Sequence, residues 1–226
     1  YLAQIAVQEE RYDDALAWLR AVTESELYFD AQLRIGAALA AAGRVEEAVD
    51  HLVGIVPDSV AEQVRIYLAH EQILRGTRGL DAALSLLDAA LADIPDNAEL
   101  LYARGLVSAQ LKFIEKHELD MRRLIELEPD NAHAYNALGY TLADQTDRLD
   151  EALTLIEQAI ELLPGDPFIL DSLGWVHYRL GHTDLAREFL QKAIGIRMDA
   201  EIAAHLGEVL WMDGHQDQAR EVWQRG

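Results

Sequence analysis

Histidines are the side chains of this sequence whose spacing comes closest to a chemical site. There are eight of them, and they become more frequent toward the C-terminus, at His177, His182, His205 and His215. His205 and Glu208 are three positions apart, which places both on one face of a helix and suits two ligands of a metal ion. No third ligand is indicated, and His182 and His215 follow turn glycines, where solvated polar residues are ordinary. We therefore predict no metal site and no cofactor.

Motifs of the common enzyme classes are absent from the sequence. It has no HExxH, nucleophile elbow, CxxC pair or phosphate-binding P-loop. The absence of cysteine excludes disulfides and thiol chemistry and is compatible with the cytoplasm or the periplasm. The many acidic pairs are typical of solvated helix faces. We predict that the chain is not an enzyme, and an enzyme domain remains the least favoured alternative.

The net charge of −21 argues against nucleic-acid binding, which requires a basic surface. The acidity serves the solubility of an extended helical array, or it provides a surface that attracts a basic partner or repels anionic lipid. Charges interrupt every long apolar stretch, so no transmembrane helix is expected.

The elements that must hold these side chains follow a repeat of about 34 residues. Leu-Gly pairs end at Gly139, Gly174 and Gly207, and an alanine in a second apolar run follows each glycine by 12 or 13 positions. The alanine position recurs in steps of 33 to 35 residues along the whole chain, at Ala15, Ala48, Ala83, His117, Ala152, Ala186 and Ala219.

Each repeat reads as two helices joined by a short turn. One unit predicts a helix over 132–144, a turn over 145–148 and a second helix over 149–162, which Pro164 ends. Glycines serve the inner turns of other units. No segment shows the alternation of a strand, so the pattern predicts an all-α chain.

Sequence signals also mark where helices begin. In "PGDP", Asp166 is expected to cap a helix that starts at Pro167, since proline suits the first helical position. Asp96 and Glu99 have the spacing of a capping box. We expect these caps to divide successive repeats.

The recurring glycine and alanine predict a close crossing of the two helices in each repeat. Glycine inside a helix costs roughly 1 kcal/mol relative to alanine, and closer packing of the backbones compensates for this cost. The prediction covers Gly36, Gly105, Gly139, Gly174 and Gly207. At His117 an imidazole replaces the small residue, so we expect a strained or specialised site, at which the imidazole displaces the neighbouring helix or turns outward.

These features resemble the tetratricopeptide repeat (TPR) family over the whole chain. One unit matches its signature at Tyr135, Leu138, Gly139, Leu142, Ala152, Ile156, Ala159 and Pro164. The resemblance implies an all-α, right-handed superhelical solenoid of about seven repeats, forming a single array over residues 1–226. It also implies a concave groove lined by the first helix of each repeat.

A second stripe of side chains on the first helices is the candidate binding surface. Its aromatic and polar composition suits recognition of a protein or peptide partner, whereas the stripe near Ala37, Ala40 and Ala41 is smooth and offers few anchors. For Trp175 and Trp211, packing between adjacent helices is an equally good interpretation. The candidate groove residues are His133, Asn136, Tyr140, Phe168, Asp171, Trp175, Tyr178, Arg179, Glu208 and Trp211.

A narrower resemblance covers about the last hundred residues. The segments "NALGYTLAD" (136–144), "LDSLGWV" (170–176) and "AEIAAHLGEVLW" (200–211) look like the C-terminal repeats of proteobacterial TPR lipoproteins. The resemblance implies an adaptor at the periplasmic face of the outer membrane. Such an adaptor activates a carboxyl-terminal processing protease and brings it cell-wall hydrolases as substrates.

Two further expectations follow. Tyr1 falls inside the first helix of an incomplete unit, so we expect the chain to be part of a longer protein with more repeats upstream. The favoured function is a binding adaptor or scaffold, and a self-assembling structural scaffold is the main alternative. If the narrower resemblance does not hold, the cytoplasm is the alternative location.

Overall fold

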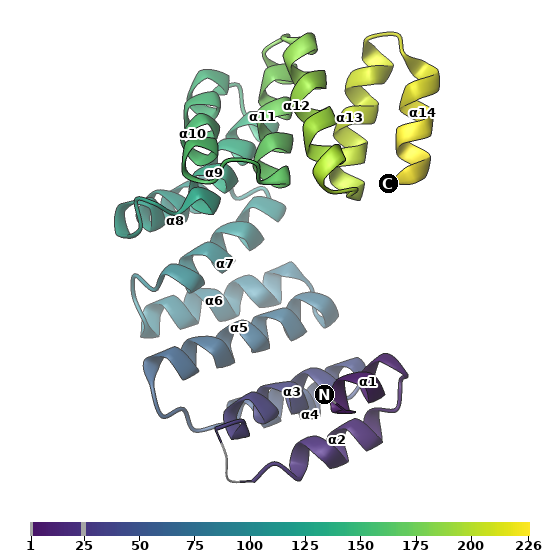
Figure 1. Ribbon diagram of the computed structural model, residues 1–226. Coiled ribbons are helices and arrows are strands. Elements are labelled where there is room, and N and C mark those ends of the chain that lie inside the picture. Colours follow the sequence, from purple (N-terminus) through teal and green to yellow (C-terminus); the bar gives the residue numbers. More distant parts are fainter. Residues whose placement is uncertain (1, 24–25) are drawn as a thin grey trace. The chain divides into compact units, whose positions relative to one another are not determined.

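A computed structural model describes residues 2–23 and 26–226 of the chain, and these residues form fourteen α-helices and no β-strand (Figure 1). The helices are α1 (Leu2–Gln8), α2 (Tyr12–Arg20), α3 (Tyr28–Ala41), α4 (Val45–Val53), α5 (Val60–Thr77), α6 (Leu80–Asp93), α7 (Ala98–Gln110), α8 (Ile114–Leu127), α9 (Ala132–Gln145), α10 (Leu149–Leu162), α11 (Pro167–Arg179), α12 (Thr183–Ile196), α13 (Ala200–Met212) and α14 (Gln216–Arg225). The predicted all-α repeat fold is confirmed, and the helices of the unit at 132–162 match their predicted bounds within one residue.

The helices divide into two compact units. Unit 1 comprises residues 1–111 and unit 2 comprises residues 112–226. In unit 1 the pairs α1–α2, α3–α4 and α5–α6 pack on one another and α7 packs on α6, and in unit 2 α8 packs on α9 and the pairs α9–α10, α11–α12 and α13–α14 pack on one another. That all of 1–226 winds into one array with a right-handed twist stays a prediction.

Glycines and side-chain caps set the helix ends. Gly43, Gly181 and Gly214 have φ values of 76°, 82° and 86°, a left-handed conformation that glycine adopts without steric cost. Asp166 caps α11 as predicted, because its carboxylate accepts from the backbone N–H groups of residues 168 and 169. The predicted cap at Asp96 is wrong by one residue.

The residue that caps α7 is Asn97. Its side-chain oxygen accepts from the N–H of Leu100 at 3.0 Å. Asp96 lies outside the helix with a φ of 59°. Asn131 caps α9 in the same way. In both "PDN" junctions the Asp therefore belongs to the turn, and the Asn is the cap of the helix that follows.

The close helix crossings at Gly139 and Gly174 fall where the repeat pattern predicts them, and the one predicted at Gly105 stays a prediction. All seven repeat positions, His117 included, are fully buried in the second helix of their pair. A Cβ built on Gly139 would lie 3.0 Å from the carbonyl oxygen of Ala152, and one on Gly174 would lie 3.1 Å from that of Ala186. At this distance the backbones leave no room for a side chain.

His117 does not turn outward. Its imidazole is fully buried, and Nε2 lies 3.2 Å from the carbonyl oxygen of Ala137. Because a carbonyl only accepts, Nε2 carries the proton and donates it. The hydrogen bond to α9 gives this side chain a place in the core that an alanine would leave empty.

Candidate functional site

The predicted groove residues come from three neighbouring helices of unit 2. α9 packs on α11 and α11 on α13, whereas the second helices α10 and α12 pack on the first helices that flank them. The three first helices, visible in Figure 1, therefore share one face. We refer to the ten predicted residues on it as the inner stripe.

A polar cluster joins these helices at the centre of the inner stripe. The Nδ1 atom of His205 lies 2.9 Å from Oδ2 and 3.0 Å from Oδ1 of Asp171. The hydroxyl of Tyr140 donates to Oε1 of Glu201 at 3.1 Å and lies 3.4 Å from Nε2 of His205. Residues of α9, α11 and α13 thus form one chain of contacts, which we call the Asp171–His205 cluster.

The protonation of His205 follows from its neighbours. Burial lowers the pKa of His205, but the hydrogen bond and charge of Asp171, helped by Glu201 and Asp144, outweigh burial, so that the pKa is raised. In the charged form both ring nitrogens donate, and Tyr140 is left with its single proton for Glu201. Burial, followed by the charge of Glu201, raises the pKa of Tyr140 and keeps the phenol protonated.

Trp175 packs against this cluster. Its ring stacks on His205 with centroids 4.4 Å apart and an interplanar angle of 24°, and the ring of Tyr178 lies 5.3 Å away. The side chain is 8% exposed. This burial favours the packing alternative for Trp175 over a role as an exposed anchor, and Asp171 is buried as well.

Arg179 is engaged inside the protein. Its guanidinium donates to the carbonyl oxygens of Ala143, Asp144 and Thr146, at 2.9 Å for Asp144 and 3.3 Å for Thr146. These carbonyls lie at the C-terminal end of α9, where backbone acceptors lack helical partners and a cation is favoured. Arg179 therefore ties α11 to α9.

Other members of the inner stripe present surface to solvent. His133, Phe168 and Glu208 are exposed, and the ring of Phe168 lies 5.1 Å from the guanidinium of Arg197. Burial and the neighbouring Glu208 raise the pKa of Tyr178.

Trp211 is half-buried at the edge of the inner stripe. Its ring lies 5.7 Å from that of Trp223 and 5.2 Å from the guanidinium of Arg220. Asn136 is half-buried too, and its Oδ1 atom is shielded from solvent with no hydrogen-bond partner in the described structure.

His205 and Glu201 were missed as members of the site. The sequence pattern paired His205 with Glu208, whereas the structure places it on Asp171. The signal that was available is the separation of 34 residues between Asp171 and His205, which is one repeat period. Residues one period apart lie side by side when first helices stack.

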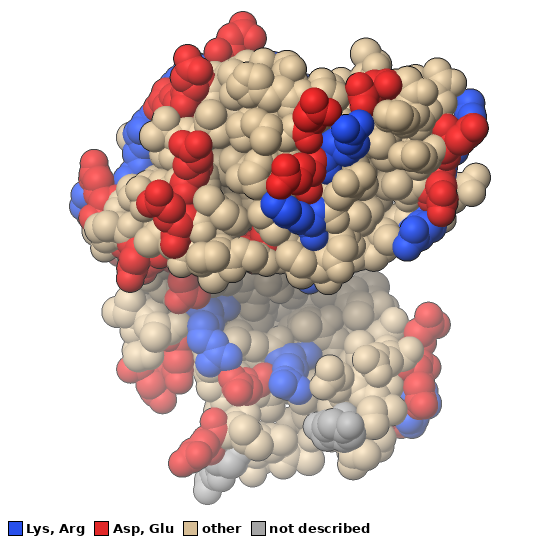
Figure 2. All heavy atoms as spheres, turned by 45° about the horizontal axis from the view of Figure 1, so that its top comes forward, with Lys and Arg blue, Asp and Glu red and all other residues tan. Residues whose placement is uncertain are grey.

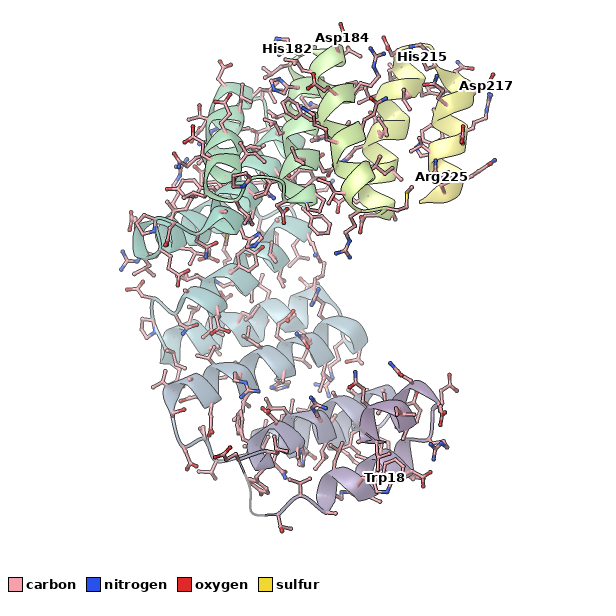
Figure 3. All side chains as sticks on the ribbon, in the orientation of Figure 1. Trp18, His182, Asp184, His215, Asp217 and Arg225 are labelled. Carbon is pink, nitrogen blue, oxygen red and sulfur yellow. The ribbon has the colours of Figure 1, made fainter. Side chains whose placement is uncertain are left out.

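No group of three potential metal ligands occurs among the described residues. His182 and His215 lie at the starts of α12 and α14. With Asp184 and Asp217 they occupy the same end of unit 2 in Figure 3. No helix within 2–23 or 26–226 is long and apolar enough to cross a membrane.

Acidic side chains lie in scattered groups on the face drawn in Figure 2, and basic ones lie beside many of them. Glu118 of α8 illustrates the pairing, because it contacts Arg148 at 2.7 Å and Arg122 at 2.7 Å. The hydrogen bond from Arg148 is the main cause that lowers the pKa of Glu118 to about 2. Such exposed pairs contribute little to stability individually.

Two sequence models described as tetratricopeptide repeat match the chain. One matches residues 2–58 and 119–167, and the other matches residues 169–197. A TPR repeat-containing protein of Pseudomonas aeruginosa, PA4667, is 38% identical over 207 residues, which are 92% of this chain and 35% of that protein. The human mitochondrial import receptor subunit TOM70 is 29% identical over 72% of this chain and 28% of its own length. The chain thus spans about a third of the length of these relatives.

Solved structures support the same fold. A tetratricopeptide repeat protein from Parabacteroides merdae has a TM-score of 0.72 at 16% identity, over 99% of this chain and 90% of its own. A thermophilic TPR protein of Thermus thermophilus has a TM-score of 0.64 at 23% identity, over 72% and 91%. At these low sequence identities, the similarity to the two structures shows only the fold. With its helix pairs, its buried repeat positions and the matching family models, the chain belongs to the tetratricopeptide repeat family.

Proposed function

We propose that the chain is the partner-binding part of a non-catalytic adaptor, and that unit 2 binds a protein or peptide through the inner stripe. TPR repeats generally mediate protein–protein interactions, and their fold is typically an interaction scaffold without catalysis. The observation that carries the proposal is the combination of exposed Phe168 and Glu208 with a buried cluster that fixes the helices beneath them.

The inner stripe has two kinds of residues in this proposal. Phe168 and Trp211 provide large, stiff contact surfaces that lose little rotamer entropy on binding, and Glu208 and His133 provide polar contacts. Asp171, Trp175 and Arg179 support them from within. A face whose side chains are held in place loses less entropy when a partner binds.

The finer proposal for the partner rests on the resemblance of segments 136–144, 170–176 and 200–211 to proteobacterial TPR lipoproteins. The partner is then a periplasmic carboxyl-terminal processing protease, and its cell-wall hydrolase substrates are brought by the same adaptor. This chain covers 35% of the length of its P. aeruginosa relative. In an adaptor of that length, further segments are available to bind the protease and its substrates.

Titration calorimetry with the purified protease tests the proposal. Phe168→Ala is expected to weaken binding at least tenfold, because a partner that uses this ring loses a buried contact. Leu185→Ala on α12 is the matched control, since Leu185 is 42% exposed against 39% for Phe168 but lies on a second helix. Equal losses for the two variants would remove the inner stripe from the interface.

A second measurement separates the adaptor from a self-assembling scaffold. Light scattering over a concentration series should give a constant mass for the free chain, and the protease should degrade a cell-wall hydrolase faster when the chain is added. A mass that climbs with concentration, without protease binding, would favour the scaffold.

A further inference from the structure

A pocket of about 310 Å³ lies in unit 1, between the first helices α5 and α7. Leu68 on α5 and Ala103, Leu106 and Val107 on α7 form its apolar walls. Nothing in the sequence pattern singled out this place. It is separate from the inner stripe, which belongs to unit 2.

A buried carboxylate lines the pocket. Glu71 is 4% exposed, and the Nε atom of Arg75 lies 2.9 Å from its Oε1 atom. Oε1 is shielded from solvent and has no hydrogen bond of regular geometry in the described structure. Glu71 therefore has an ion-pair partner but an unsatisfied acceptor, a costly arrangement for a buried charged group.

The charges around the pocket are unbalanced. Glu71 and Glu99 both line it, whereas Arg75 is the only cation among its lining residues, and the Arg75 side chain is half-exposed. Burial raises the pKa of Glu71, and Arg75 only partly offsets this effect. A second cation inside the pocket would find a surplus of negative charge.

We propose that this pocket receives a lysine side chain from an extended segment of a protein partner. The methylene groups of the lysine pack on Leu68 and Val107, and its ammonium group pairs with the carboxylate of Glu71, with Glu99 at the entrance. The proposal rests on the proposed function, since it assumes a protein partner, but it adds a site on unit 1 and the chemistry that the site selects. Alternating pockets along a groove are a general means of reading an extended peptide.

Two short peptides test the chemistry directly. They have the sequence Ala-Ala-X-Ala-Ala with blocked ends, where X is lysine or the uncharged isostere norleucine. Each is titrated into the ¹⁵N-labelled 226-residue chain and followed by NMR. The lysine peptide is expected to give saturable shifts in amides of α5 and α7, the side-chain amides of Gln72 and Gln110 included. The norleucine peptide should bind at least tenfold more weakly.

Variants of the chain sharpen the test. Glu71→Gln keeps the shape of the side chain and removes its charge, so the lysine peptide should lose at least tenfold in affinity. Asp81→Asn, at an exposed carboxylate of unit 1 on α6, is the control and should change nothing. Arg75→Gln removes the competing cation and should tighten binding of the lysine peptide several-fold, an effect that a purely structural pair would not produce.

Several outcomes would contradict the proposal that the pocket binds lysine. Equal affinity for the two peptides, shifts that map outside α5 and α7, or a Glu71→Gln variant that binds as the parent does would each do so. The protease titration with Phe168→Ala reports separately on the proposed function. If the protease binds but the lysine peptide is not preferred, the proposed function stands and the lysine pocket is refuted. If the lysine peptide is preferred but the protease does not bind, the lysine pocket stands and the protease as partner is refuted.

Discussion

The Nδ1–H of His205 donates to the carboxylate of Asp171 at 2.9 Å inside unit 2, and the two residues are 34 positions apart. One repeat period along the chain thus becomes direct contact in space. Both side chains are buried. Removing either one therefore leaves the other without its partner, and water cannot take the place of that partner. The pair holds two successive repeats in register at the centre of the inner stripe.

The first prediction concerns pH. The pKa of His205 is raised in the folded chain, so its charged form stabilises the fold. That stabilisation is fully present below the ordinary pKa of about 6.5 and is lost as the pH rises through the raised value. Asp171→Asn should remove this dependence. The melting temperature, measured by circular dichroism, should therefore fall less between about pH 6 and about pH 8.5 in the variant than in the parent chain.

The groups that face His205 are Asp171, Tyr140, Glu201 and Asp144. An exposed pair serves as control: His215 and Asp213 are 3.4 Å apart at the surface, and Asp213→Asn should leave the pH profile nearly unchanged. A proton NMR titration that places the pKa of His205 at or below its ordinary value would contradict the prediction.

The second prediction concerns Trp175. Its ring is buried and stacked on His205, so Trp175→Ala should leave a cavity and cost about 3–5 kcal/mol of unfolding free energy. Phe168→Ala, at an exposed ring, should cost less than about 1 kcal/mol. Chemical denaturation of both variants provides the measurement. A Trp175→Ala variant as stable as the parent that binds its partner poorly would instead mark Trp175 as an anchor.

Regular features of this fold were predictable, because one physical cause repeats in every unit. Ala152 and Gly139 could be placed at a helix crossing from sequence because only small residues permit that distance. Trp175 could not, since a large ring on a first helix fits either the interior or the groove. The cap at Asn97 was missed because Asp96 and Asn97 are both good capping residues, and backbone geometry decides between them.

The third prediction concerns His117, where the sequence pattern alone pointed to overpacking. The imidazole fills a buried position and donates to the carbonyl of Ala137. His117→Ala should therefore lower the melting temperature and cost about 1–3 kcal/mol, since the hydrogen bond to the Ala137 carbonyl is lost and a void remains. The reverse substitution, Ala152→His, places an imidazole where Gly139 requires close approach, and should destabilise by overpacking. Stabilisation by His117→Ala in calorimetry would restore the view of a strained site.

The last prediction concerns the glycines of the helix crossings. Helix propensity alone favours Gly→Ala by roughly 1 kcal/mol. A Cβ on Gly139 would meet Cγ1 of Ile156 at 2.6 Å and the carbonyl oxygen of Ala152 at 3.0 Å, and the backbone atom cannot move aside without separating α9 from α10. Gly139→Ala should therefore lower the melting temperature by several degrees.

Gly195 is the matched control, because it also lies in a helix, α12, but a Cβ there would meet no atom within 4 Å. Gly195→Ala should leave the melting temperature unchanged or raise it, by less than the full propensity gain because the residue is next to the helix end. Gly36→Ala should fall between the two, since its Cβ would meet only the side chain of Leu52, at 2.8 Å, and a side chain can rotate away. Calorimetry of the three variants measures this order. If Gly139→Ala were as stable as Gly195→Ala, the helices would tolerate a wider crossing, and close approach would not be what requires glycine at this position.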